Sequence, residues 1–161
     1  MDFSVRKAKE TDASAILGLI RELAGYEKQP NAVVIAEKDI IDAAFGDNPL
    51  TSIFVAEVNS NVVGIALFYY GFSTWKGRSL HLEDLIVNEN FRGHGIGKAL
   101  MMRVVQVAQK EKLNRMDWEV LDWNEPAIKF YKSLGTSFFS DWNLCRLFGP
   151  EIQAIKTGNL Q

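Results

Sequence analysis

The residues that most clearly suggest chemistry form a glycine-rich stretch with a cation at each end, Arg92-Gly93-His94-Gly95-Ile96-Gly97-Lys98. Alternating glycines let the backbone turn sharply, so that several N–H groups converge on one point. A helix is expected to begin here, and the positive end of its dipole adds to those donors. The stretch therefore predicts an anion site suited to phosphate, with Arg92 and Lys98 supplying positive charge.

The spacing of these glycines excludes the two common nucleotide motifs. A P-loop would need a glycine where Arg92 stands and a Ser or Thr where Ala99 stands. The dinucleotide fingerprint G-x-G-x-x-G would need its third glycine at Lys98. The stretch fits the pattern R-x-x-G-x-G instead.

A pair of carboxylates, Glu83 and Asp84, interrupts a run of apolar residues that is typical of a strand. An ionised carboxylate that faces a core is costly without a partner, so Glu83 is expected either at a functional site or at an exposed edge. Strand alternation predicts that Asp84 points to the opposite face. Asp84 is therefore as well explained by a structural salt bridge or a cap as by contact with a substrate.

Tyr131 lies at helical spacing from Ile128 and Leu134, so the pattern alone fits a place in the core. His81 and His94 are the only histidines and Cys145 is the only cysteine, a set too small to predict a metal site. Cys145 is expected to be a buried small hydrophobe rather than a reactive thiol.

The elements that must position these residues follow from hydrophobic periodicity and from helix caps. Strands are predicted at 3–7, 53–58, 62–70, 79–88, 115–121 and 144–148. Helices are predicted after Thr11-Asp12 and up to Gly25, around 40–45, at 97–112, and from the cap Asn124 to Gly135. The order β-α-α-β-β-β-α-β-α-β predicts an α/β fold with a mixed, mostly antiparallel sheet and helices on both faces.

Composition limits the classes of protein to consider. The chain has 161 residues with 24% charged residues and a net charge of −2, which predicts a single domain over 1–161 and argues against nucleic-acid binding. The N-terminus lacks the apolar segment of a signal peptide, and no apolar run approaches the ~20 residues of a membrane helix. We expect a cytoplasmic protein with no membrane partner.

Three segments in order resemble the GNAT N-acetyltransferases, and among them most resemble the spermidine/spermine (diamine) N-acetyltransferases. The segments are Leu82-Glu83-Asp84-Leu85-Ile86-Val87, then Arg92 to Gly97, then Trp123-Asn124-Glu125-Pro126-Ala127-Ile128-Lys129-Phe130-Tyr131. Tyr26-Glu27 and Arg146-Leu147-Phe148 also match, so the resemblance covers almost the whole chain. R-x-x-G-x-G alone is only moderately specific, whereas the three segments in this order are much more so. The resemblance implies a GNAT fold and a homodimer.

The resemblance also implies roles for individual residues. The backbone of Leu85, Ile86 and Val87 would pair with the pantetheine arm of acetyl-CoA. The pyrophosphate would be wrapped by Arg92, Gly93, His94, Gly95, Ile96, Gly97 and Lys98. The other side of the cofactor would be lined by Asn124, Glu125, Pro126 and Ala127. Glu83 would be the general base and Tyr131 the general acid, while Tyr26, Glu27, Glu83 and Asp84 would bind the substrate amine. No metal is implied.

These roles agree with the chemistry of acetyl transfer. An alkylammonium with a pKa of ~10 must lose a proton before it attacks, and Glu83 beside Asp84 can hold the cation and accept that proton through water. An N–H at a bulge near Leu85 could stabilise the oxyanion. The phenol of Tyr131 can protonate a thiolate of pKa ~8.5 if it lies beside the sulfur. Direct attack requires no enzyme nucleophile.

The substrate stays open at this point. Polyamine acetyltransferases of this type carry further acidic residues after the Tyr-Glu pair and before the L-E-D strand. Here those stretches read Lys28-Gln29-Pro30-Asn31-Ala32 and Gly71-Phe72-Ser73-Thr74-Trp75, without a carboxylate. A shorter diamine, a lysine-like amino acid such as thialysine, or another amine is the alternative to a polyamine. A protein acetyltransferase and a non-catalytic acyl-CoA-binding module are further alternatives, and the presence of both Glu83 and Tyr131 argues against the latter.

Overall fold

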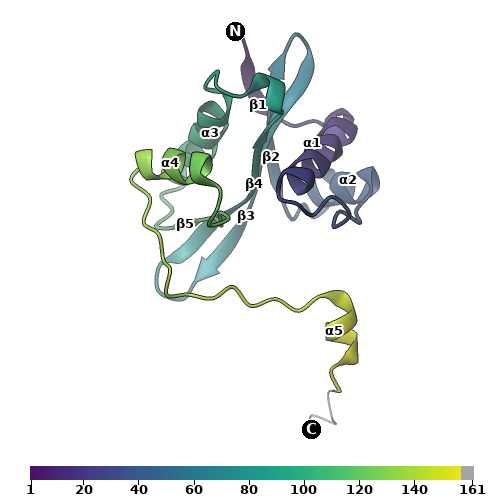
Figure 1. The fold of residues 1–161 in the computed structure, drawn as a ribbon, viewed down its shortest axis with the longest axis vertical. Helices are drawn as coiled ribbons and strands as arrows, with labels where there is room; N and C mark the ends of the chain where they lie inside the picture. The colour runs from purple at the N-terminus through teal and green to yellow at the C-terminus, as the bar shows by residue number, and fades with distance from the viewer. Residues whose placement is uncertain (157–161) are drawn as a thin grey trace. The chain divides into compact units, whose positions relative to one another are not determined.

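The computed structural model describes residues 1–156, and the chain divides into two compact units, Met1–Glu119 and Val120–Gln161 (Figure 1). The assignment of all 161 residues to a single domain stays a prediction.

The first unit contains a five-stranded sheet in the order β1-β2-β3-β4-β5. Its strands are β1 (Ser4–Lys7), β2 (Ser52–Val58), β3 (Asn61–Ser73), β4 (Gly77–Val87) and β5 (Met116–Asp117). The first four pair antiparallel and β5 pairs parallel with β4, which confirms the predicted mixed, mostly antiparallel sheet. The predicted strand at 115–121 is shortened to the two residues of β5.

Three helices cover this sheet, namely α1 (Ala13–Tyr26), α2 (Glu37–Phe45) and α3 (Ile96–Lys110). Short 3-10 turns, η1 (Glu10–Asp12) and η2 (Glu89–Phe91), precede α1 and α3. In Figure 1, α1 and α2 lie on one side of the sheet and α3 lies on the other. The prediction of helices on both faces is therefore confirmed for this unit.

The side chains on the two faces follow strand alternation. Ile53, Val55 and Ile65 pack with α1 and α2 in one buried cluster. The residues that alternate with them along β2 and β3 face α3. Among these, Gly64 allows close packing, because a Cβ on it would lie 3.2 Å from Leu100 Cδ1 and 3.0 Å from the Ile86 carbonyl oxygen. The core thus fixes β3 and β4, the strands that carry the candidate site.

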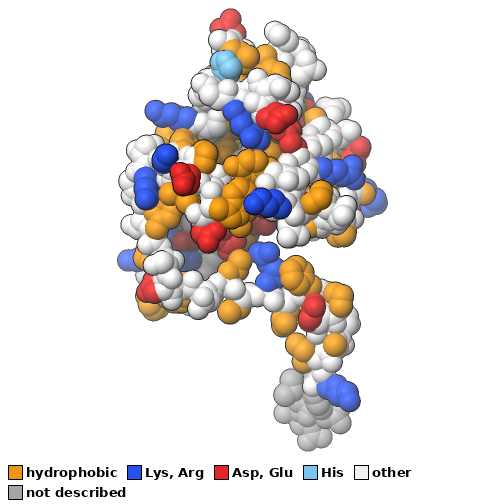
Figure 2. Space-filling view, in the orientation of Figure 1, with side chains coloured by type: hydrophobic (Ala, Val, Ile, Leu, Met, Phe, Trp, Pro, Cys, Tyr) orange, Lys and Arg blue, Asp and Glu red, His pale blue; other side chains and the backbone are white. Residues whose placement is uncertain are grey.

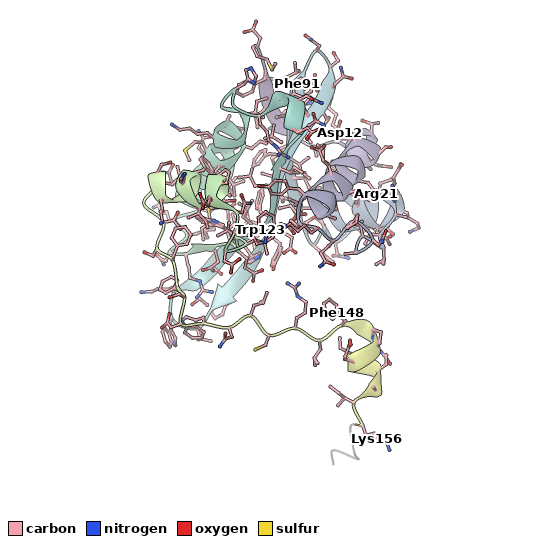
Figure 3. The ribbon with its side chains drawn as sticks, viewed as in Figure 1. Asp12, Arg21, Phe91, Trp123, Phe148 and Lys156 are labelled. Carbon is pink, nitrogen blue, oxygen red and sulfur yellow. The ribbon has the colours of Figure 1, made fainter. Side chains whose placement is uncertain are left out.

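Arg6 of β1 joins three elements through two carboxylates. Its guanidinium donates to Asp12 Oδ2 at 2.7 Å and to Glu57 Oε2 at 2.7 Å, and the backbone N–H of Lys9 also donates to Asp12 Oδ2 at 2.7 Å. Figure 3 shows Asp12 beside the start of α1. The hydrogen bonds from Arg6 hold the pKa of Asp12 below its usual value, although burial acts against them.

We predict that Asp12→Ala destabilises the fold by about 1–3 kcal/mol at pH 7, as expected for a charge-assisted hydrogen bond in a half-buried pair. Because the pKa of Asp12 is lower in the folded state, its contribution is present above the unfolded pKa of about 4 and is lost as pH falls through the folded pKa. Urea unfolding at pH 7 and pH 3 should give a difference between wild type and variant that shrinks at pH 3. A difference independent of pH, or one equally large for exposed Asp47→Ala, would contradict this account.

The second unit contains α4 (Glu125–Ser133) and α5 (Gly149–Ala154). The side chain of Asn124 accepts a hydrogen bond from the N–H of Ala127 at 3.3 Å, and Gly135 has φ 80°, so the predicted cap and end of this helix are confirmed.

The predicted final strand at 144–148 is wrong, because these residues have no regular secondary structure and α5 follows them. An alternating pattern becomes a strand only when a neighbouring strand takes up its backbone hydrogen bonds, and none pairs with it in the described part of the chain. Cys145 lies in this segment and is exposed, so the prediction of a buried cysteine is also wrong.

Candidate functional site

A β-bulge in β4 lies at the carboxylate pair. Asp84 pairs with Leu67 while Leu82 pairs with Phe68, which leaves Glu83 without a partner on β3. An extra residue of this kind breaks alternation locally and leaves backbone groups out of the ladder. The bulge expected near Leu85 is thus present two residues earlier, and the strict alternation predicted for Glu83 and Asp84 does not hold across it.

The charge of a third carboxylate, that of Glu27 at the end of α1, also acts on Asp84. Burial, and then the charges of Glu83 and Glu27, raise the pKa of Asp84 to about 6. Desolvation also raises the pKa of Glu27. Neighbouring carboxylates that repel one another are stabilised by a bound cation. We call Glu27, Glu83 and Asp84 the acidic cluster.

Two further side chains border the acidic cluster. The ring of Tyr69 lies 4.9 Å from that of His81, and His81 Nε2 lies 3.6 Å from Glu83 Oε2. Burial raises the pKa of Tyr69, and the charges of Glu83 and Glu119 and a hydrogen bond with Glu83 add to this effect. Neither Tyr69 nor His81 is among the site residues predicted from the sequence. His81 could have been recognised as a neighbour of Glu83, because it lies two residues before it in the same strand. The proximity of Tyr69 follows only from the register between β3 and β4.

The glycine-rich stretch forms the turn that the sequence predicts. Gly93 has φ 80° and Gly95 has φ 82°, a left-handed conformation that favours glycine, and Gly95 is the N-cap of α3. Ile96 is buried and anchors the first turn of the helix. The backbone N–H groups at the start of α3 are therefore available to an anion.

Arg92 is directed toward α1 by several contacts. Its Nε donates to the Val87 carbonyl oxygen at 2.9 Å, and its guanidinium lies 5.1 Å from the ring centre of Tyr26. One of its terminal nitrogens lies 3.7 Å from Glu22 Oε1. Arg92 thus connects the glycine turn to the end of α1, where the family resemblance implies that Tyr26 and Glu27 bind the substrate.

Glu22 of α1 is not among the site residues predicted from the sequence. Its Oε2 accepts from Asn88 Nδ2 at 2.9 Å and its Oε1 accepts from the N–H of Glu89 at 3.0 Å. Nothing in its local sequence distinguishes it from other charged residues on the polar face of a helix. The single carboxylate holds the segment between β4 and α3 in place.

The edge of β4 that faces β5 is open over most of its length. The parallel ladder joins only Leu80 to Met116 and His81 to Asp117. From Leu82 to Val87, no strand pairs with this edge in the described part of the chain. Its backbone N–H and C=O groups can therefore bind an extended molecule with amide groups.

The remaining predicted site residues lie in the second unit. Asn124, Glu125, Pro126 and Ala127 form the cap and first turn of α4, and Tyr131 lies further along this helix. Tyr131 is 7% exposed, and burial raises the pKa of its phenol to about 12. Such a phenol stays protonated at neutral pH and is able to donate a proton.

Residues 1–156 contain no group of three or more His, Cys, Asp or Glu side chains placed to hold a metal ion. No helix among them is long and apolar enough to cross a membrane. Figure 2 shows basic and acidic side chains interspersed on the face that it displays.

The acetyltransferase (GNAT) family model matches residues 18–136. The chain is 38% identical to thialysine N-epsilon-acetyltransferase of Bos taurus and 40% identical to that of Mus musculus, in each case over 94% of this chain and 95% of the relative. It is 35% identical to human spermidine/spermine N(1)-acetyltransferase-like protein 1 over 93% of this chain but 23% of that protein.

Among solved structures, an integron cassette protein from the mobile metagenome of V. cholerae has a TM-score of 0.77 and 25% identity, covering 95% of this chain and 96% of that one. The similarity supports the α/β fold with a mixed five-stranded sheet.

Proposed function

Because the chain belongs to the acetyltransferase (GNAT) family and is an acetyl-CoA-dependent N-acetyltransferase, we propose that it acetylates the side-chain amine of a small lysine-like amino acid. The acidic cluster of Glu27, Glu83 and Asp84 is the observation that carries this proposal, because it suits one ammonium group. The names of the relatives at 38% and 40% identity support a thialysine-type substrate over a polyamine. A short diamine is the second candidate, since it presents the same primary amine.

In this proposal Glu83 is the general base. Its side chain is 53% exposed, so it can accept the proton of the ammonium directly or through a water molecule. Asp84 and Glu27 hold the cation while Glu83 takes the proton. A bound ammonium lowers the pKa of Asp84 again, because it favours the ionised carboxyl.

The residues present fit acetyl-CoA as the second substrate. The open edge at Leu85, Ile86 and Val87 supports pairing with the amides of the pantetheine arm. The left-handed glycines 93 and 95 at the start of α3 support a pyrophosphate site in residues 92–98. The bulge at Glu83 supports an oxyanion contact from a backbone N–H. Asn124 to Ala127 as cofactor contacts and Tyr131 as general acid follow from the resemblance.

An amine panel tests the substrate. We expect release of CoA from acetyl-CoA to be fastest, by kcat/KM, with thialysine, followed by lysine and putrescine, and slower with spermidine and spermine. A greater kcat/KM for spermidine than for thialysine would indicate that the substrate is a polyamine and not a lysine-like amino acid. No turnover with any amine, despite measurable binding of acetyl-CoA by calorimetry, would favour an acyl-CoA-binding module.

The binding of acetyl-CoA is expected to depend on Glu22 of α1. Its hydrogen bonds to Asn88 and to the Glu89 N–H hold the segment that leads into the glycine turn. Glu22→Ala should raise the KM for acetyl-CoA about 5- to 30-fold and leave kcat within about twofold, because two hydrogen bonds outside the reacting centre are lost. Glu22→Gln, which keeps one acceptor oxygen, should recover part of the affinity. An unchanged KM, or an equal loss with exposed Glu10→Ala, would contradict this role.

The homodimer and the cytoplasmic location stay predictions from the sequence. Light scattering of the purified chain tests the first of them.

A further inference from the structure

The first unit contains a cavity that is separate from the acidic cluster and the glycine turn. Its volume is about 600 Å³, and it lies where α3 ends and β2 begins, beside the loop that follows α2. None of the residues given a role in acetyl transfer lines it. Its contents therefore need not overlap with either substrate.

The floor of the cavity is aromatic. The rings of Phe54 and Phe68 stack with their centres 5.7 Å apart and an interplanar angle of 22°. Tyr70 meets Phe68 edge-on at 6.4 Å, and its hydroxyl donates to Glu111 Oε1 at 2.6 Å. Tyr70 is 39% exposed, and the Arg78 guanidinium lies over one face of its ring, 4.1 Å from the ring centre, so its remaining exposed surface is what a ligand can contact.

The rim carries positive charge that carboxylates do not balance. Lys7, Arg103 and Lys110 line the cavity, and no salt bridge joins any of them to a carboxylate within residues 1–156. The guanidinium of Arg103 lies over the Phe54 ring at 5.3 Å and donates to Gln106 Oε1 at 3.1 Å. Glu111 is the one carboxylate of the lining, and it already pairs with Arg78 at 2.9 Å.

We infer that this cavity binds a small organic anion with an aromatic body, such as an aromatic carboxylate. Phe54 and Phe68 are each 3% exposed, so contact with the flat ring of a ligand comes mainly from the exposed part of Tyr70. The cations of the rim offer charge-assisted hydrogen bonds to a carboxylate, and Arg103 can bind both of its oxygens. A cavity of about 600 Å³ accommodates a molecule of this size.

Calorimetric titration of the full chain with indole-3-acetate tests this inference. We expect saturable binding that persists when acetyl-CoA is saturating, and at least tenfold weaker binding of the neutral indole-3-acetamide and of inorganic phosphate. Equal affinity for the acetamide would show that the cationic rim does not contribute to binding. Equal affinity for phosphate would show that the aromatic floor does not contribute. Displacement by acetyl-CoA would assign the binding to the donor site. Absence of saturable binding would overturn the inference.

Two matched variants locate the binding. Arg103→Gln should weaken indole-3-acetate binding about tenfold, as expected for one lost charge-assisted contact. Arg21→Gln, which removes an exposed cation of α1 outside the cavity (Figure 3), should leave it unchanged. Both variants should retain acetyl transfer, which shows that they fold, and this activity reports on the proposed function independently of the cavity. Equal weakening in the two variants would indicate attraction by net charge instead of a site.

Discussion

Glu83→Gln is expected to lower kcat for amine acetylation at pH 7 by about 10²–10⁴-fold, the range for loss of a general base. The amide keeps the shape of the side chain but cannot accept the proton of the ammonium. The KM for acetyl-CoA should change little, because Glu83 lies at the bulge of β4 and not in the glycine turn.

The pH profile separates this role from a structural one. Below its pKa of ~10, the deprotonated fraction of an amine rises about tenfold for each unit by which the pH increases. The activity of Glu83→Gln should therefore rise with pH more steeply than that of the wild type, because the variant depends on amine that is already deprotonated. Exposed Glu37→Gln is the matched control and should behave as wild type. An equal loss of activity in Glu83→Gln at all pH values would contradict the role of Glu83 as general base.

Tyr131→Phe is expected to lower kcat by about 10²-fold or more, since the departing thiolate loses its proton donor. Burial raises the pKa of this phenol to about 12, so it stays protonated across the working pH range and the loss should be nearly independent of pH. The substitution keeps the ring, and the free energy of unfolding should fall by no more than about 1–2 kcal/mol.

Tyr70→Phe is the control for Tyr131→Phe, because it also removes a phenol hydroxyl but from a residue outside the proposed chemistry. Its kcat should stay within about twofold of the wild type. Turnover left intact in Tyr131→Phe would remove this residue from the mechanism. A loss of turnover together with a large fall in thermal stability would assign it a structural role.

Prediction from sequence worked where the cause is local. The glycines at 93 and 95 are required by a left-handed turn, and Asn124 caps its helix through the N–H of Ala127. It failed at 144–148, because an alternating pattern needs a partner strand that the pattern itself does not specify. Cys145 is exposed for the same reason.

By itself the sequence determined the family, the sheet class and the glycine turn that begins α3, since residue type and spacing along a short stretch suffice for each. Only the tertiary structure decided how Glu27 meets Glu83 and Asp84, because a helix end and a bulged strand come together through packing between residues far apart in the chain. The same holds for Glu22 at the turn before α3 and for the cations around the aromatic cavity. A bulge shifts register by one residue and so changes which side chains share a face.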